Sequence, residues 1–288
     1  MKSGRAKCAI RLAVASLFGV VAAASAQAQS GSPAQAMLTD SFVFNAGIFV
    51  VASDTKAKVN GQSVSNPEID FDQTFGKASD ATRWRLDGLW RFTPNHHLRA
   101  LYFDNSLTRN KTLTQDIKWD NAVYKVGANV EAKNSIKVFE LAYEYAFMHE
   151  PTYELAATFG VHYADIKLGL AGAASVTDAN GNVTQKAFES RSSNLPAPFP
   201  VIGFRAAWAA SPQWYLDAQA QVLKYKVDGY DGNWSDVRLG ATWMYARNWG
   251  VGMGYNRFTT RVDVTKPTLQ GNVKLGYSGL QAFLTGSF

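Results

Sequence analysis

Ionisable side chains recur at alternate positions within otherwise apolar stretches of the sequence. Residues spaced by two lie on one face of a β-strand, so each stretch carries charges on one side and apolar groups on the other. Opposite charges gathered on such faces could neutralise one another inside a closed barrel, or line a narrow passage that orients a solute. We expect this charge network to contain Arg83, Arg85, Asp87, Asp104, Glu140, Glu144, His162, Arg205, Asp217 and Arg238.

Short turns predict which members of this network lie opposite each other. A two-residue turn at Pro94-Asn95 and three-residue turns centred on Pro151 and Ser211 fix the register of three hairpins. The predicted pairs are Arg85 with Asp104, Glu140 with His162, and Arg205 with Asp217. Small barrels are nearly filled by their own side chains, which favours neutralisation over an open passage.

Catalysis needs a base and a nucleophile placed together, and the histidines offer only one candidate. His162 stands well inside a strand, where Glu140 could hold it as a general base. His96, His97 and His149 lie at short turns, and no Ser or Asp nucleophile is visibly placed beside His162. We therefore predict no catalytic residues and no enzyme.

Metal binding has one weak candidate. Glu68, Asp70 and Asp72 alternate in a loop and could contact Ca²⁺ through their oxygens. A solvated acidic loop explains the same spacing, so we predict no metal site and no cofactor.

Ten alternating segments form the framework that must position these residues. Short turns and long loops alternate between them, and an even number returns both termini to one side. Omitting one hairpin would give eight strands instead. The ten segments cover residues 41–53, 81–92, 97–115, 126–148, 153–168, 199–209, 214–227, 235–246, 249–263 and 273–288. Asn180-Gly181 suits a hairpin tip, so the fifth and sixth segments should extend beyond the membrane, as should the third and fourth around Asp120-Asn121.

The positions of the aromatic residues distinguish a membrane barrel from a soluble sandwich. Both folds alternate, but aromatic side chains here gather beside the short turns, as rings that are half apolar do at a membrane interface. The sequence therefore predicts an all-β, closed antiparallel barrel whose charged face points inward. The expected girdle is Trp90, Phe92, Phe147, Trp208, Trp214 and Trp249.

The two ends of the chain indicate export and closure. Residues 1–28 have the basic start, the apolar run and the small-residue cleavage sites of a signal peptide, and they contain Cys8. Four positive charges of the formal net charge of +6 lie in this segment, so the basic balance gives no reason to expect nucleic-acid binding. We assign 29–40 to a periplasmic leader and 41–288 to the barrel, whose alternating last strand ends at Phe288.

Signal, strand rhythm, girdle and Phe288 together resemble the small, porin-like outer-membrane β-barrels of Gram-negative bacteria. The resemblance implies residence in the cell outer membrane, contact with its lipid and lipopolysaccharide, and Phe288 as the signal read by the barrel-assembly machinery. It favours a porin-like or structural surface protein that passes or binds small solutes. The alternative is a plugged barrel whose extracellular loops adhere or bind a ligand. An outer-rim enzyme that modifies lipid A or peptides, as in omptin proteases and lipid A deacylases of similar size, is the least favoured.

Overall fold

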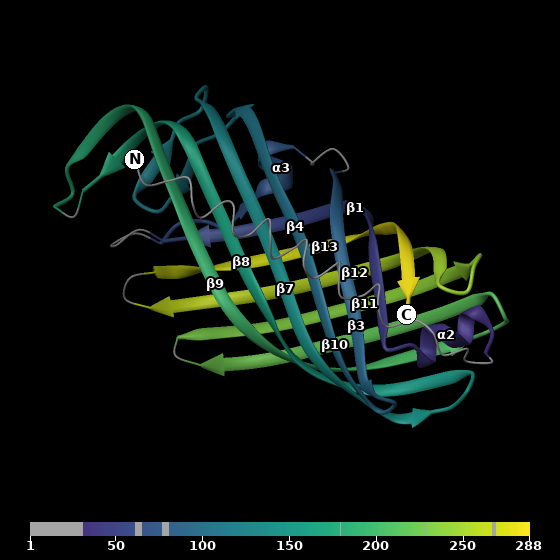
Figure 1. Cartoon of the computed structure of the whole chain (residues 1–288). Coiled ribbons are helices and arrows are strands. Elements are labelled where there is room, and N and C mark those ends of the chain that lie inside the picture. Colours follow the sequence, from purple (N-terminus) through teal and green to yellow (C-terminus); the bar gives the residue numbers. More distant parts are fainter. Residues whose placement is uncertain (1–30, 61–64, 77–80, 179, 228, 267–268) are drawn as a thin grey trace, which may run out of the picture.

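The computed structural model describes residues 31–60, 65–76, 81–178, 180–227, 229–266 and 269–288 (Figure 1). The predicted signal peptide lies outside these residues. The elements are α2 (Pro33–Thr39), β1 (Phe42–Val59), β2 (Ile69–Asp70), α3 (Phe71–Phe75), β3 (Ala81–Thr93), β4 (His96–Thr112), β5 (Ile117–Trp119), β6 (Ala122–Tyr124), β7 (Asn129–His149), β8 (Tyr153–Thr177), β9 (Val183–Ala209), β10 (Trp214–Val227), β11 (Tyr230–Met244), β12 (Trp249–Lys266) and β13 (Leu269–Ser287).

Ten long strands close into an antiparallel ring. All thirteen strands share one sheet, and the short strands β2, β5 and β6 lie outside the ring. The ring closes between its first and last strands, where β1 pairs with β13 from Val43↔Ser287 to Val59↔Gly271. Phe42 and Phe288 exchange two further backbone hydrogen bonds of 2.8 Å. Ten strands are thus confirmed over eight, and the carboxyl terminus completes the ring as predicted.

The outer surface of the ring carries an apolar belt. On β7, Phe139, Leu141 and Tyr143 are exposed, whereas Glu140 and Glu144 between and beside them are fully buried. The other strands alternate in the same way, with large apolar side chains outward. A soluble sandwich would reverse this arrangement, so the predicted barrel faces are confirmed. Short turns and both described termini lie at one end of the barrel, which is the periplasmic end in barrels of this class.

Two glycines on the inner face of β12 make room for side chains of β13. A Cβ at Gly252 would lie 2.3 Å from Cε2 of Phe283, and one at Gly254 would lie 2.6 Å from Nε2 of Gln281. Any larger residue would displace these interior side chains. The narrow barrel therefore needs glycine at both positions.

The described part of the predicted leader forms helix α2. Ser32 caps the helix reciprocally with Gln35, and Pro33 occupies the first turn, so the local sequence contains a complete start signal. The helix sits across the periplasmic end of the barrel (Figure 1). Its buried side chains Ala34, Met37 and Leu38 pack with Val43, Leu89, Ala207, Ala209, Tyr215 and Met244. Within the described residues, no helix is long and apolar enough to span a membrane.

The outer end differs from prediction in one hairpin. β8 and β9 extend to a tip at Gly181, whose φ of +86° suits glycine, and this extension is confirmed. The turn at Asp120-Asn121 exists as well, but it joins the short strands β5 and β6. That hairpin folds onto β8, with Tyr124 opposite Ala174, instead of prolonging β4 and β7.

The outer half of the interior is an apolar core. Inward residues of β7 and β8 change from charged to aliphatic toward the outer end, from Glu140 to Ile136 and from His162 to Ile166. α3 adds Phe71, whose ring lies 5.7 Å from that of Trp119. Charged and apolar layers therefore succeed each other along the barrel axis.

Candidate functional site

Glu140 is the centre of the first charged cluster inside the barrel. Its carboxylate accepts hydrogen bonds from Arg238 at 2.6 Å and from Gln221 at 2.8 Å, and lies 3.2 Å from Nε2 of His162. Arg238 also contacts Asp236 at 3.1 Å. All these side chains are buried, so their charges are compensated within the cluster and not by bulk water.

A second charged cluster lies nearer the periplasmic end. Glu144 accepts from Nε of Arg99 at 2.7 Å and from Nε of Arg205 at 2.8 Å. Arg205 also donates to Glu154, which accepts from His149 at 2.8 Å when that ring nitrogen is protonated. His97 lies between the two carboxylates, 3.9 Å from Glu144 and 3.8 Å from Glu154. Together the clusters cross the lumen and join strands on opposite sides of it.

Asp104 does not belong to the network, and its predicted pairing with Arg85 is wrong. A β-bulge between Arg91 and Thr93 shifts the register by one residue, so Arg85 lies opposite Phe103. A one-residue shift reverses the face of every following side chain. Asp104 therefore points outward, where Lys137 lies 3.5 Å away.

The other predicted pairs keep their faces. Glu140 lies opposite His162, as predicted. Arg205 lies opposite Gln219 and not Asp217, because the turn around Ser211 is longer than three residues. A shift of two residues leaves both side chains inward. Arg83 binds Asn105 at 3.2 Å nearer the outer end, away from both clusters.

The sequence reasoning missed several partners of the network. Arg99 faces inward only because of the bulge, so the expected parity of β4 hid it. Glu154 directly follows a turn, a position usually left to solvent. Arg91, His97 and Asp236 are further buried charged residues outside the predicted network. Arg91 could have been found, since it shares the face of Arg85 and Asp87.

Asp40 fastens α2 to the barrel. Both its carboxylate oxygens accept from Arg247 at 2.8 Å, and Ser287 donates to it at 2.7 Å. Arg91 donates to the backbone oxygens of Asp40 and Met37, each at 2.9 Å. Hydrogen bonds to the Asp40 carboxylate and to backbone oxygens thus hold α2 at the periplasmic end of the barrel.

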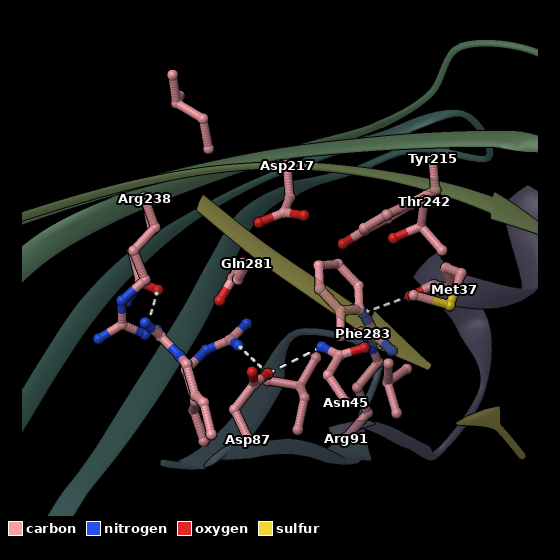
Figure 2. Close-up of a pocket in the computed structure, with 16 residues that line it drawn as sticks. Met37, Asn45, Asp87, Arg91, Tyr215, Asp217, Arg238, Thr242, Gln281 and Phe283 are labelled. Carbon is pink, nitrogen blue, oxygen red and sulfur yellow. Dashed lines mark hydrogen bonds and ion pairs between the residues drawn. The ribbon is translucent and has the colours of Figure 1, made fainter. Parts of the chain in front are cut away.

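A small cavity lies between α2 and Arg238 of the first charged cluster (Figure 2). Its volume is about 50 Å³, enough for a few water molecules but not for an organic solute. Asp87, Asp217 and Arg238 project into it (Figure 2). Arg85 also lines the cavity. Arg85 contacts Asn256 at 2.8 Å and no carboxylate within 4 Å among the described residues, so water in the cavity can complete its hydrogen bonding.

An acidic group lies at the outer end. Oxygens of Asp54, Asp70 and Asp72 approach within 4.8 Å of one another. Burial raises the pKa of Asp72 above its ordinary value, while Arg109 binds its carboxylate at 2.8 Å. Glu68, which the sequence grouped with these residues, binds Lys274 instead at 2.9 Å. Lysine and arginine thus already balance most of this charge.

The predicted girdle residues are all exposed at the periplasmic edge of the belt. Four of them, Trp90, Phe92, Phe147 and Trp249, lie against aromatic neighbours, including Phe42 with Trp90 and Trp249 with Phe288. The ring of Phe288 also stacks on that of Phe44 at 6.1 Å. The terminal residue therefore joins the two edges of the ring through its side chain as well as its backbone.

Deleting Phe288 should slow assembly, because it removes both the aromatic contacts and the last hydrogen bonds of the closing strand pair. We expect a smaller fraction of folded, heat-modifiable protein on a gel at early times of refolding into lipid vesicles. Phe288→Tyr keeps the ring and should assemble like the unaltered protein. Equal refolding rates of the deletion and the unaltered chain would contradict this role.

Comparison with solved structures relates this architecture to known proteins. The outer membrane protease OmpT from Escherichia coli superposes with a TM-score of 0.58 at 13% sequence identity, covering 86% of this chain and 96% of that chain. The chain has the outer-membrane β-barrel fold. Its location is the outer membrane of the Gram-negative cell envelope, where the apolar belt faces lipid.

More distant barrels cover similar shares of the chain. The translocator domain of the autotransporter NalP from Neisseria meningitidis gives a TM-score of 0.42 at 12% identity, covering 84% of this chain and 88% of that chain. The toluene transporter TodX from Pseudomonas putida gives 0.37 at 10% identity, covering 90% and 93%. No protein-family model and no curated protein matches the sequence. Identities this low establish a fold and carry no activity.

Proposed function

We propose that this protein is a plugged barrel that acts through its membrane-facing and outer surfaces, and not a channel or an enzyme. The observation that carries the proposal is the filled interior. α2 occupies the periplasmic mouth, two charged clusters cross the middle, and the apolar core fills the outer half. The cavity of about 50 Å³ is too small for passage of a solute.

The position of the histidines supports a non-enzymatic role. His162, the candidate base, is buried between Glu140 and the ring of Trp234, whose centroid lies 4.7 Å from that of the imidazole. A substrate at the outer rim would not reach it through the apolar core. The partners that we propose are outer-membrane lipid, lipopolysaccharide and, during biogenesis, the barrel-assembly machinery that reads Phe288.

Conductance in planar bilayers tests the plug. We expect the refolded protein to show no steady openings, because nothing the size of a hydrated ion fits past α2 and the charged clusters. Asp40→Ala removes the carboxylate that Arg247 and Ser287 hold, so it should release α2 and add brief, infrequent flickers at most, because the charged clusters and the apolar core still fill the lumen.

A matched control separates release of the helix from general damage. Asp263→Ala removes a carboxylate that Arg261 binds at 2.8 Å on the exposed outer surface, and it should stay silent. Steady openings of the unaltered protein would favour the porin-like alternative over the plugged barrel.

A further inference from the structure

The backbone hydrogen-bond ladder between β9 and β10 is interrupted toward the outer end of the barrel. Backbone pairing of these strands runs from Tyr215↔Ala209 only to Val222↔Ile202. β10 continues to Val227 and β9 begins at Val183, yet beyond Ile202 and Val222 no further pair between the two strands occurs among the described residues. β9 still pairs with β8 through this region, and β10 with β11. We call this opening in the hydrogen-bond ladder the β9–β10 seam.

Proline explains why the ladder stops. Pro196, Pro198 and Pro200 occupy alternate positions of β9, directly beyond its last pair with β10. Alternate residues of a strand direct their N–H groups toward the same neighbour, and proline has no N–H to donate. Because the ladder with β8 remains unbroken here, the missing donors are those that would face β10.

The seam opens within the apolar belt. Pro200 and Pro198 pair with Val161 and Tyr163 of β8, whose side chains are exposed on the lipid face. Val161 and Tyr163 lie eight and ten residues from the start of β8 at Tyr153, so they belong to the outer half of the belt. Acyl chains of the outer leaflet therefore reach the seam directly.

Aromatic side chains close the seam from inside. The ring of Phe199 on β9 lies 5.4 Å from that of Tyr225 on β10 and 5.5 Å from that of Trp234 on β11. Tyr225 Oη and Trp234 Nε1 are buried without a hydrogen-bond partner among the described residues. Side-chain contact replaces backbone pairing at this place, and rings can move aside at far lower cost than a hydrogen-bonded strand.

Cationic side chains flank the seam at its outer edge. Lys224 and Lys226 follow Val222 on the lipid-facing side of β10. Lys224 is exposed and forms no ion pair with a described residue, while the exposed side chain of Lys226 lies 3.7 Å from that of Asp231. Lys224 and Lys226 alternate with Leu223 and Tyr225 along β10, so two cations line the lipid-facing side of the apolar slot and can bind the negative headgroup of a lipid whose acyl chain enters it.

We propose that the β9–β10 seam is a lateral binding slot for an acyl chain of an anionic outer-leaflet lipid. The chain inserts between the strands against Phe199, Leu223 and Tyr225, and Lys224 and Lys226 hold the phosphate of its headgroup. The slot lies in the wall of the barrel, so it is independent of whether the lumen conducts.

Photo-crosslinking in vesicles of defined composition tests the slot. The protein is refolded into phosphatidylcholine vesicles that contain phosphatidylglycerol with a diazirine in its acyl chain, and labelled residues are mapped by mass spectrometry. We expect labels on inward-facing Phe199, Leu223 or Tyr225 in addition to lipid-facing residues such as Ile202. Labels confined to lipid-facing side chains would overturn the proposal.

Two variants identify the cause of inner labelling. Pro198→Ala with Pro200→Ala restores two N–H donors, should extend the ladder and should lower inner labelling several-fold, whereas Pro94→Ala in a periplasmic turn should leave it unchanged. Lys224→Ala with Lys226→Ala should lower it for phosphatidylglycerol only. Equal inner labelling by the diazirine analogue of phosphatidylcholine overturns the headgroup assignment.

Should the proline variant fail to fold, as judged by heat-modifiable mobility, Tyr225→Trp blocks the same slot and must lower inner labelling.

Discussion

Arg205→Ala should lower the free energy of unfolding by about 3–5 kcal/mol, because it leaves two carboxylates buried without their shared cation. Arg205 is 2% exposed and donates to both Glu144 and Glu154. In this variant Glu144 would still bind Arg99. Glu154 would keep His149 as its one close partner, with Arg91 and His97 farther away at 3.9 and 3.8 Å. Urea unfolding of the protein refolded into lipid vesicles, followed by tryptophan fluorescence, measures the loss.

A double-mutant cycle shows whether the loss comes from the buried charge. Glu144→Gln removes one uncompensated carboxylate, so combined with Arg205→Ala it should cost less than the sum of the two single changes. Asp263→Ala, which removes an ion pair on the exposed surface, is the matched control and should cost less than about 1 kcal/mol. Additive losses at Arg205 and Glu144 would mean that the pair is not coupled.

The faces of the strands could be predicted from the sequence because alternation is a local property. Trp84, Leu86 and Leu141 are exposed, and Arg85, Glu140 and Arg205 are buried, as the pattern predicted. Cross-strand partners depend instead on the number of residues in each turn and bulge. One bulged residue near Phe92 was enough to misplace Asp104 and to conceal Arg99.

Helix α2 and its docking at the periplasmic end could be predicted only in part. Ser32, Pro33 and Gln35 form a complete start signal for a helix, so a short helix in the leader could be predicted from the sequence. Its docking was not, because Ala34, Met37 and Leu38 form too small an apolar face to indicate a partner. Asp40 and Arg247 are joined across 207 residues of sequence, a separation that no local pattern reveals. The docking of α2 at the periplasmic end therefore follows from tertiary contacts alone.

The filled lumen and the apolar belt place different demands on the same strands. Inside, charges are tolerated because each cluster compensates them, as Glu140 does with Arg238. Outside, hydrocarbon offers no such partner, so a single charge carries its full desolvation cost. A charge introduced inside the apolar belt should therefore cost more than the same charge introduced beyond it, and Leu141 lies well inside the belt.

Leu141→Lys should destabilise the barrel by about 2–4 kcal/mol, the cost of lysine near the midplane of a bilayer-spanning barrel. Leu141 is 44% exposed on the lipid face of β7, six residues beyond Phe147 of the girdle. At a rise of about 3.3 Å per residue and a tilt of about 40°, it lies roughly 15 Å above the girdle, near the middle of an apolar band about 25 Å tall. The measurement is again urea unfolding in vesicles.

Glu131→Lys is the matched control, because Glu131 is exposed on the same face of β7 but ten residues farther toward the outer end, beyond the belt. It should change the free energy of unfolding by no more than about 0.5 kcal/mol, as surface substitutions usually do. Leu141→Ala, which removes bulk without adding charge, should fall between the two. If lysine costs the same at both positions, hydrocarbon does not surround Leu141 and the belt cannot be the membrane-embedded face.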